Sequence, residues 1–118
     1  MADLRQQILR GTLDLLVLKA LSQAPAHGYA IARWVEAATD QTLHIEDGSL
    51  YPALYRLEER GLVETEWRLT ADHRRAKYYA LTAAGRKGLR VETASWTRYA
   101  RAVFAALDIP LQPVPAGG

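Results

Sequence analysis

The chain has 118 residues, with 15 Lys and Arg against 13 Asp and Glu, a formal net charge of +2, and no cysteine. A chain of this length is expected to form one domain that removes about two-thirds of its unfolded surface from water. The missing cysteine excludes disulfides, thiolate zinc sites and cysteine nucleophiles. The net charge is too small to indicate nucleic-acid binding by itself, so the positions of the charges must decide.

The sequence predicts a soluble, cytoplasmic protein with no membrane partner. The start "MADLRQQILRG" lacks the apolar region of a signal peptide. The most apolar run, "LLVLKAL", is interrupted by Lys19 and is far shorter than a membrane-spanning helix.

Two helices with one buried face each are predicted before residue 40. The first begins near Thr12, whose hydroxyl suits an N-cap, and ends before Ala24-Pro25. Its apolar residues recur at helical spacing, at Leu13, Leu16, Val17, Ala20 and Leu21. The second helix runs from about Gly28 to Thr39, and its predicted buried stripe consists of Ile31, Trp34, Val35 and Ala38.

A third helix is predicted within "EDGSLYPALYRLEERG", residues 46–61. Leu50, Leu54 and Leu57 share one arc of this helix, with Ala53 beside them, so that arc belongs to the core. The opposite arc collects Ser49, Tyr51, Pro52, Tyr55, Arg56 and Glu59. The proline predicts a helix start near Ser49, because first-turn residues need no intrahelical N–H bond. The free N–H groups of such an end suit a phosphate.

A two-stranded ribbon follows, because the apolar period changes from helical to alternating. In "LVETEWRLT" Val63, Thr65, Trp67 and Leu69 alternate with charged residues, and "KYYALT" returns as the partner strand. The turn "ADHRRA" and the return strand carry the concentrated cations of the chain, Arg74, Arg75 and Lys77. A loop kept soluble by its charge is the alternative interpretation of these cations.

A long helix, capped by Thr82, is predicted over residues 83–107. No later segment remains to cover its apolar stripe, which predicts a second subunit related by a twofold axis. Folding back over its own domain is the alternative. The residues expected at the subunit interface are Leu89, Trp96, Tyr99, Val103 and Leu107.

The predicted fold is mainly α with a small β-hairpin wing. Three helices followed by a two-stranded ribbon is the order of a winged helix-turn-helix, in which the third helix reads DNA. We therefore predict a DNA-binding domain at residues 1–82, a dimerisation helix at 83–107 and a flexible tail at 108–118. Tyr51, Tyr55 and Arg56 are the side chains expected to reach the DNA groove.

Three segments resemble the successive signatures of the PadR family of bacterial transcriptional regulators. They are "HGYAI" at 27–31, "GSLYPALYRLEERGLVE" at 48–64 and "RRAKYYALTAAG" at 74–85. The single C-terminal helix resembles the compact subfamily. The resemblance implies a homodimeric repressor, with an interface made by the final and first helices, that releases double-stranded operator DNA when a small molecule binds.

The same resemblance implies particular site residues. The DNA-contacting positions of the family fall on Tyr29, Ser49, Tyr51, Pro52, Arg56 and Lys77. Some relatives bind flat hydrophobic compounds in an aromatic-lined cavity between the final helices, and Trp96 stands at the corresponding place.

Each of these residues also has a structural interpretation. Tyr51 and Tyr55 could cover the edge of the core, and Arg56 could form a surface ion pair with Glu58 or Glu59. The three tryptophans, Trp34, Trp67 and Trp96, are all suited to packing.

Other functional classes have weaker support in the sequence. Ser49, Asp47 and His44 form the one cluster that resembles a catalytic triad, but a helix cap explains Ser49 better, so no enzyme is predicted. The scattered histidines predict no metal site, and the glycines form no phosphate-binding loop, so no cofactor is predicted. A winged helix that binds only proteins is the remaining alternative, and the basic wing favours DNA over it.

Overall fold

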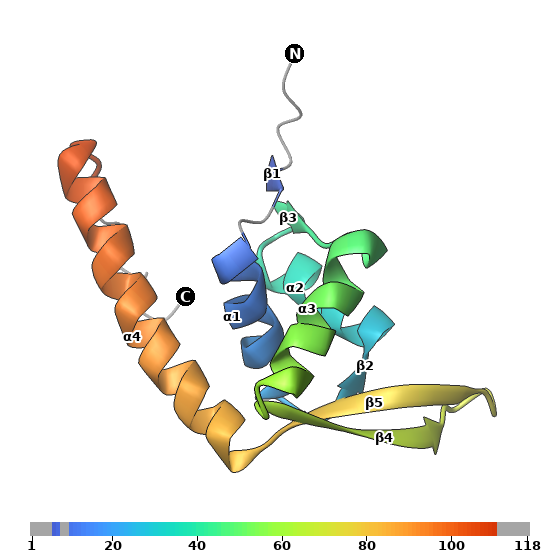
Figure 1. Cartoon of the computed structure of the whole chain (residues 1–118). Helices are drawn as coiled ribbons and strands as arrows, with labels where there is room; N and C mark the ends of the chain where they lie inside the picture. Colours follow the sequence, from blue (N-terminus) through green and yellow to red (C-terminus); the bar gives the residue numbers. More distant parts are fainter. Residues whose placement is uncertain (1–5, 8–9, 111–118) are drawn as a thin grey trace, which may run out of the picture.

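The structure is a computed structural model that describes residues 6–7 and 10–110, so most of the predicted tail lies outside it. It is mainly α with a small β wing, as predicted (Figure 1). In chain order the elements are β1 (Gln6–Gln7), α1 (Arg10–Leu21), β2 (Ala26–His27), α2 (Gly28–Ala38), β3 (Leu43–His44), α3 (Asp47–Glu59), β4 (Val63–Leu69), β5 (Arg75–Leu81) and α4 (Ala83–Ala106).

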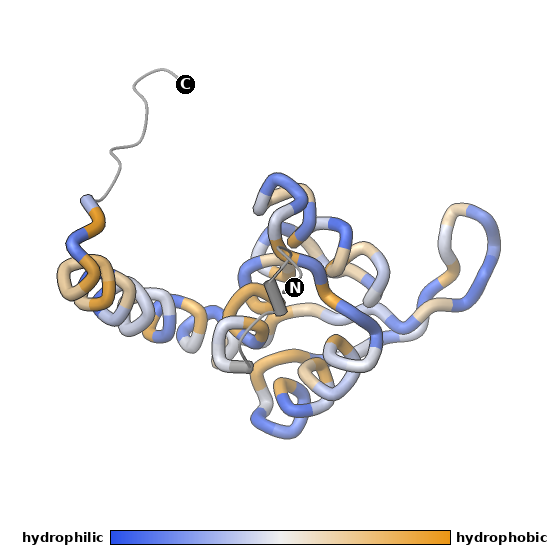
Figure 2. The backbone as a smooth tube through the Cα atoms, turned by 90° about the horizontal axis from the view of Figure 1, so that it is seen from above, coloured by the Kyte–Doolittle hydropathy of each residue, from blue (hydrophilic) through white to orange (hydrophobic). Residues whose placement is uncertain are grey.

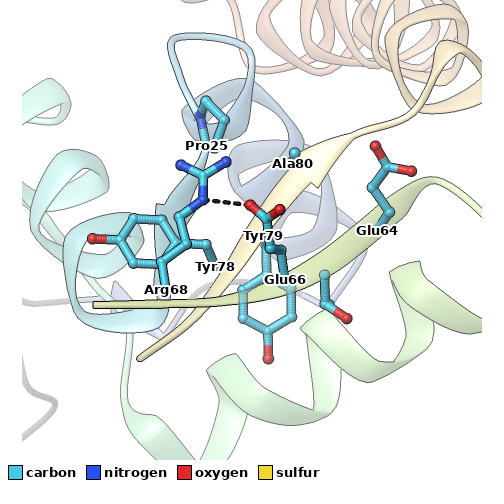
Figure 3. Close-up of a pocket in the computed structure, with 8 residues that line it drawn as sticks. Pro25, Glu64, Glu66, Arg68, Tyr78, Tyr79 and Ala80 are labelled. Carbon is cyan, nitrogen blue, oxygen red and sulfur yellow. Dashed lines mark hydrogen bonds and ion pairs between the residues drawn. The ribbon is translucent and has the colours of Figure 1, made fainter. Parts of the chain in front are cut away.

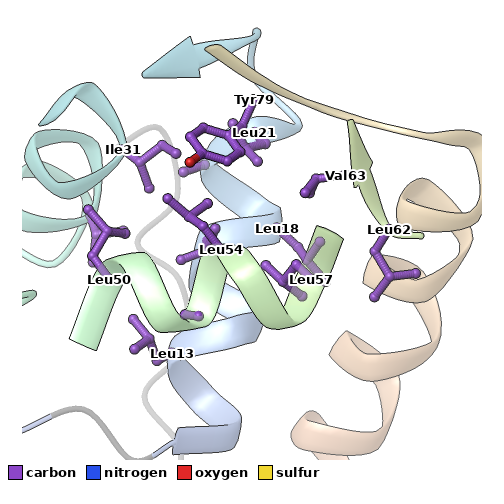
Figure 4. Close-up of a cluster of buried hydrophobic side chains, with 14 of the residues drawn as sticks. Leu13, Leu18, Leu21, Ile31, Leu50, Leu54, Leu57, Leu62, Val63 and Tyr79 are labelled. Carbon is purple, nitrogen blue, oxygen red and sulfur yellow. The ribbon is translucent and has the colours of Figure 1, made fainter. Parts of the chain in front are cut away.

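The core lies where α1, α2 and α3 meet the base of the sheet (Figure 4). All four α3 residues predicted for the core are buried, at Leu50, Ala53, Leu54 and Leu57. The other helices agree less closely with the predicted stripes. Leu18 is buried although it is not among the predicted residues of the first stripe, whereas Trp34 is only half-buried and Ala38 is exposed. Burial of the four α3 residues of the core therefore decides which face of α3 is exposed to solvent.

Two predicted helix starts are wrong by two residues. Helix α1 begins at Arg10 rather than at a Thr12 cap. Helix α3 begins at Asp47, with Glu46 as its N-cap, so Pro52 lies inside the helix and beyond its first turn. The proline cannot donate to the carbonyl of Gly48, four residues earlier. Gly48 is exposed, so this missing bond falls on the solvent side of the helix.

The wing belongs to a sheet of three strands in the order β2-β5-β4, rather than two. Strand β5 pairs antiparallel with β4 over its whole length and with β2 at Ala26↔Tyr79 and His27↔Tyr78. A second, parallel pair joins β1 to β3. Strands of two residues show no periodicity, so the sequence could not reveal β1, β2 or β3.

The outer half of the wing projects beyond the core (Figure 2). Tyr79 and Leu81, which share one face of β5, are buried at its base. Further out, Trp67 is 58% exposed and Leu69 is exposed as well. The interpretation of Trp67 as a packing residue is therefore wrong, because the ribbon outruns the helices that would cover it.

Helix α4 is joined to the core at its first turn. As predicted, Thr82 caps it: the hydroxyl accepts from Gly85 N–H (3.0 Å). The same hydroxyl donates to the Gly61 carbonyl (2.7 Å), and the backbone N–H of Thr82 donates to Leu62 (3.1 Å). From this joint α4 runs beside α1, on the side of the domain away from the wing (Figure 1).

Most of the apolar stripe of α4 lacks cover within the described part of the chain. Trp96, Tyr99 and Leu107 are exposed, and Val103 is half-buried. Leu89 is different, because it packs against the core of its own chain. The assignment of Leu89 to an uncovered stripe is therefore wrong.

Candidate nucleic-acid interface

The solvent face of α3 carries two large tyrosines. Tyr51 is 49% exposed and Tyr55 is 64% exposed, opposite the buried leucines. Ser49 and Pro52 are exposed on the same face. The prediction that this arc faces solvent is confirmed for these four residues, which the structure brings together.

The α3 face is continuous with the start of α2. The Tyr51 hydroxyl lies so close to Gly28 that a Cβ built there would be 2.7 Å from it. Tyr29, the next residue, is also exposed, and the guanidinium carbon of Arg33 lies 5.9 Å from the centre of its ring. Gly28 and Arg33 were not predicted as parts of the site, because spacing along one helix does not reveal a contact with another.

The N-terminus of α2 is capped within this surface. His27 Nδ1 accepts from Ala30 N–H at 3.2 Å, and its ring packs edge-on against Tyr78 at 5.3 Å between centroids. The histidine thus fixes the first turn of α2 against β5. This helix end, Tyr29 and the α3 tyrosines form one surface.

The Arg56 side chain does not reach into solvent from the exposed arc as predicted. Its Nη2 donates to Asp14 Oδ1 of α1 at 2.8 Å, and the two side chains are 27% and 17% exposed. Its Nε is buried without a partner among the described residues. A half-buried ion pair of this kind holds α3 against α1, and neither Glu58 nor Glu59 is the partner that the alternative interpretation named.

Acidic side chains border the tyrosines of α3. The Glu59 carboxylate beside Tyr55 raises the pKa of the phenol, first as a potential hydrogen-bond acceptor and then by its negative charge. Tyr55 therefore stays a neutral phenol at physiological pH. Its hydroxyl can donate or accept a hydrogen bond.

The wing brings two predicted cations, Lys77 and Arg75, to the side of α3 and carries the third, Arg74, at its turn. Lys77 Nζ lies 3.9 Å from Glu58 of α3. Arg74 lies at the turn and pairs with Asp72 at 3.5 Å. Arg75 lies against the Trp67 ring, with 5.0 Å between its guanidinium carbon and the ring centre. Along the ribbon, Lys77 thus lies at the base, Arg75 on the outer half of the strand and Arg74 at the tip.

The opposite face of the wing carries acidic side chains (Figure 3). A hollow of about 250 Å³ lies there beside Pro25, Glu64, Glu66, Arg68 and Tyr78. The Arg68 guanidinium is paired with Glu66 at 2.5 Å. Two carboxylates against one paired arginine make this face unsuited to phosphate.

A second candidate site lies between α1 and α4. Thr12, Leu15, Trp96 and Tyr99 are among the residues that line a cleft of about 380 Å³. The Trp96 indole N–H donates to the Thr12 hydroxyl at 3.3 Å. The structure therefore places Trp96 in a cleft of its own subunit, although the sequence predicted a cavity between two subunits.

The cluster that resembled a triad is not assembled. His44 Nδ1 lies 2.7 Å from buried Glu36, and within residues 10–110 no hydrogen bond joins it to Ser49. No group of three or more potential metal ligands occurs in the described part of the chain. No described helix is long and apolar enough to cross a membrane.

Comparison with known proteins gives a consistent result. A family model described as "Transcriptional regulator PadR-like family" matches residues 17–91. The chain is 28% identical to an uncharacterised protein X of Lysinibacillus sphaericus, over 78% of this chain and 84% of that protein. A solved PadR family transcriptional regulator from Eggerthella lenta is 37% identical, covers 86% of both chains and superposes with a TM-score of 0.69. A PadR-like regulator from Bacillus cereus is 26% identical, with coverages of 86% and 97% and a TM-score of 0.72.

Proposed function

The chain belongs to the PadR-like family of transcriptional regulators, and we propose that it is a homodimeric repressor that a small aromatic or hydrophobic compound releases from operator DNA. Membership of the family supports DNA-binding regulation. Repression, the dimer and the effector are the further steps of this proposal. Catalysis is not part of this proposal, because regulators of this kind act by binding. Since the proposed target is operator DNA, the protein would act in the cytoplasm.

The observation that carries the proposal is the surface formed by α3, the start of α2 and one face of the wing. Exposed tyrosines on a helix beside a cationic ribbon suit base edges and phosphates together. The proposed contacts are Tyr29, Ser49, Tyr51, Pro52 and Tyr55 from the helices, and Arg74, Arg75 and Lys77 from the wing. Arg56 instead orients α3 through its pair with Asp14.

The proposed dimer forms through α4. A row of exposed Trp96, Tyr99 and Leu107 on one helix is an apolar surface that a twofold mate would cover. Two α3 helices would then meet successive major grooves, which are about 34 Å apart. Sedimentation equilibrium tests this step: a monomer at micromolar concentration would refute it.

The proposed effector site is the cleft beside Trp96. Its volume of about 380 Å³ lies within the range of small-molecule sites, about 300–1,000 Å³. An aromatic compound stacked on the indole would push α4 relative to α1 and so change the spacing of the two α3 helices. By linkage, such a compound must bind less tightly to the DNA-bound dimer.

A gel-shift titration against the DNA upstream of the chain's own gene, with unrelated duplex as competitor, tests the function. Tyr51→Ala should weaken specific binding by about 1–3 kcal/mol per lost base contact and leave folding intact. The matched control is Val91→Ala on α4, an exposed apolar residue outside the proposed DNA, dimer and effector surfaces, which should leave binding unchanged. Equal binding of both duplexes by the wild type would instead favour a winged helix that binds proteins.

A further inference from the structure

The outer half of the wing exposes an aromatic side chain on the face that turns toward α3. Thr65 of β4 donates to Glu58 of α3 at 3.4 Å, so this face adjoins the proposed DNA surface. Side chains alternate along a strand, so Trp67 and Leu69 lie on the same face as Thr65. An exposed tryptophan at this position calls for a role other than core packing.

Arg75 is the side chain that Trp67 contacts from the neighbouring strand. The register pairs Leu69 with Arg75 and Trp67 with Lys77, so Arg75 reaches the indole diagonally across the ribbon. Its guanidinium carbon lies 5.0 Å from the ring centre, within cation–π range. The indole thus lies against the guanidinium on the face toward α3.

Arg75 also differs from the other wing cations in its charge partners. Arg68 pairs with Glu66, Arg74 with Asp72 and Lys77 with Glu58. Within residues 6–7 and 10–110, no carboxylate lies within 4.0 Å of Arg75. A phosphate would therefore displace no carboxylate from Arg75, whereas it would compete with one at each of the others.

We propose that Arg75 makes the dominant phosphate contact of the wing and that Trp67 is the positioning residue that orients it. This inference rests on the proposed function, since it assumes that the wing meets DNA. A guanidinium already held against a ring loses less side-chain freedom on binding than one in solvent. Its outer N–H groups remain free to donate to phosphate oxygens.

Fluorescence-anisotropy titrations of the full chain, over a series of salt concentrations, test the proposal with two labelled duplexes. One is the DNA upstream of the gene and the other is an unrelated sequence of the same length. Arg75→Ala should weaken binding to both about tenfold and lower the salt slope of log K by about one for each wing on the DNA. Arg74→Ala, which removes the same charge from the next residue, should weaken binding less than about threefold.

The role of Trp67 is measured by a double-mutant cycle. Trp67→Leu should weaken binding about threefold when Arg75 is present and have no effect in Arg75→Ala. Trp67→Tyr keeps an aromatic face and should keep wild-type affinity, whereas a role of bulk alone would not couple the effect of Trp67→Leu to Arg75. Circular dichroism of each variant shows that the fold is kept, as expected for an exposed position.

The two duplexes separate the two proposals. Independent, additive effects of the two substitutions, or equal effects of Arg74→Ala and Arg75→Ala, would overturn the role of Trp67 and Arg75 whichever duplex is used. Binding of both duplexes with equal affinity would refute the proposed function, while a coupled effect on both would still support the wing contact. Binding of neither duplex would overturn both.

Discussion

The joint between the wing and α4 gives the sharpest stability prediction. A Cβ added at Gly85 would lie 2.0 Å from the carbonyl oxygen of Leu62 and 3.2 Å from a methyl of Leu81. That oxygen accepts from the Thr82 N–H, so it belongs to the connection that sets the direction of α4. Gly85→Ala must therefore push α4 away from this joint.

The size of the effect follows from the geometry. A relaxed carbon-to-oxygen contact is about 3.3 Å, so the backbone must separate by more than an ångström. Overpacking costs about 1–3 kcal/mol, and stretching the Thr82–Leu62 hydrogen bond adds about 1 kcal/mol. The better helix propensity of alanine returns at most about 1 kcal/mol. We expect a net loss of about 3 kcal/mol.

Gly88→Ala is the matched control one turn further along α4. A Cβ there meets only Leu62 methyls, at 3.6 and 3.9 Å, which is ordinary contact. The same substitution should therefore stabilise the chain by about 0.5–1 kcal/mol, because glycine is unfavourable inside a helix.

Thermal unfolding at a fixed protein concentration measures both variants, since a dimer would make Tm depend on concentration. One kcal/mol corresponds to about 3–6 °C for a chain of this size. Gly85→Ala should lower Tm by about 10 °C or more, and Gly88→Ala should raise it by a few degrees. If Gly85→Ala unfolds within about 2 °C of the wild type, the close approach of α4 to Leu62 does not exist in solution.

Three further predictions concern other parts of the molecule. Asp14→Ala leaves the Arg56 guanidinium half-buried without its partner and should cost about 1–3 kcal/mol in urea unfolding, whereas a surface pair would cost less than 1 kcal/mol. Burial raises the pKa of Tyr79, so above pH of about 10 the unfolded chain loses the phenol proton while the folded chain still keeps it. The free energy of unfolding therefore falls as the pH rises past that value. Tyr79→Phe should reduce this fall at alkaline pH. In a variant that retains Trp96 as its one tryptophan, planar aromatic compounds should quench the fluorescence saturably, and an unresponsive indole would remove the cleft as the effector site.

Local pattern alone was sufficient for the four helices, the two long strands of the wing and most of the proposed DNA surface. The burial of Leu50, Leu54 and Leu57 and the exposure of Tyr51 and Tyr55 follow from one helical period, because both sets lie on the same helix. The alternation in β4 likewise predicted that a two-stranded ribbon follows the helices. These features need no knowledge of what the rest of the chain does.

Contacts between elements were decided by the tertiary structure. Arg56 lies on the predicted arc by angle, yet it pairs with Asp14, which is 42 residues away. A long side chain at the edge of an arc can turn to either side, and only the position of α1 selects the partner. Leu89 turns to its own core for the same reason, because α4 leaves the joint at Thr82 and Gly85 in one direction.

The wing divides most clearly into features predicted by the local sequence and features decided by the tertiary structure. Its sequence predicted the two strands and the positions of its cations, because alternation and the charged turn are local. How far the ribbon extends beyond the helices, and hence that Trp67 is exposed and stacks on Arg75, depended on the lengths and packing of α1, α2 and α3. Burial is a property of the assembled domain, and no period within a single strand encodes it.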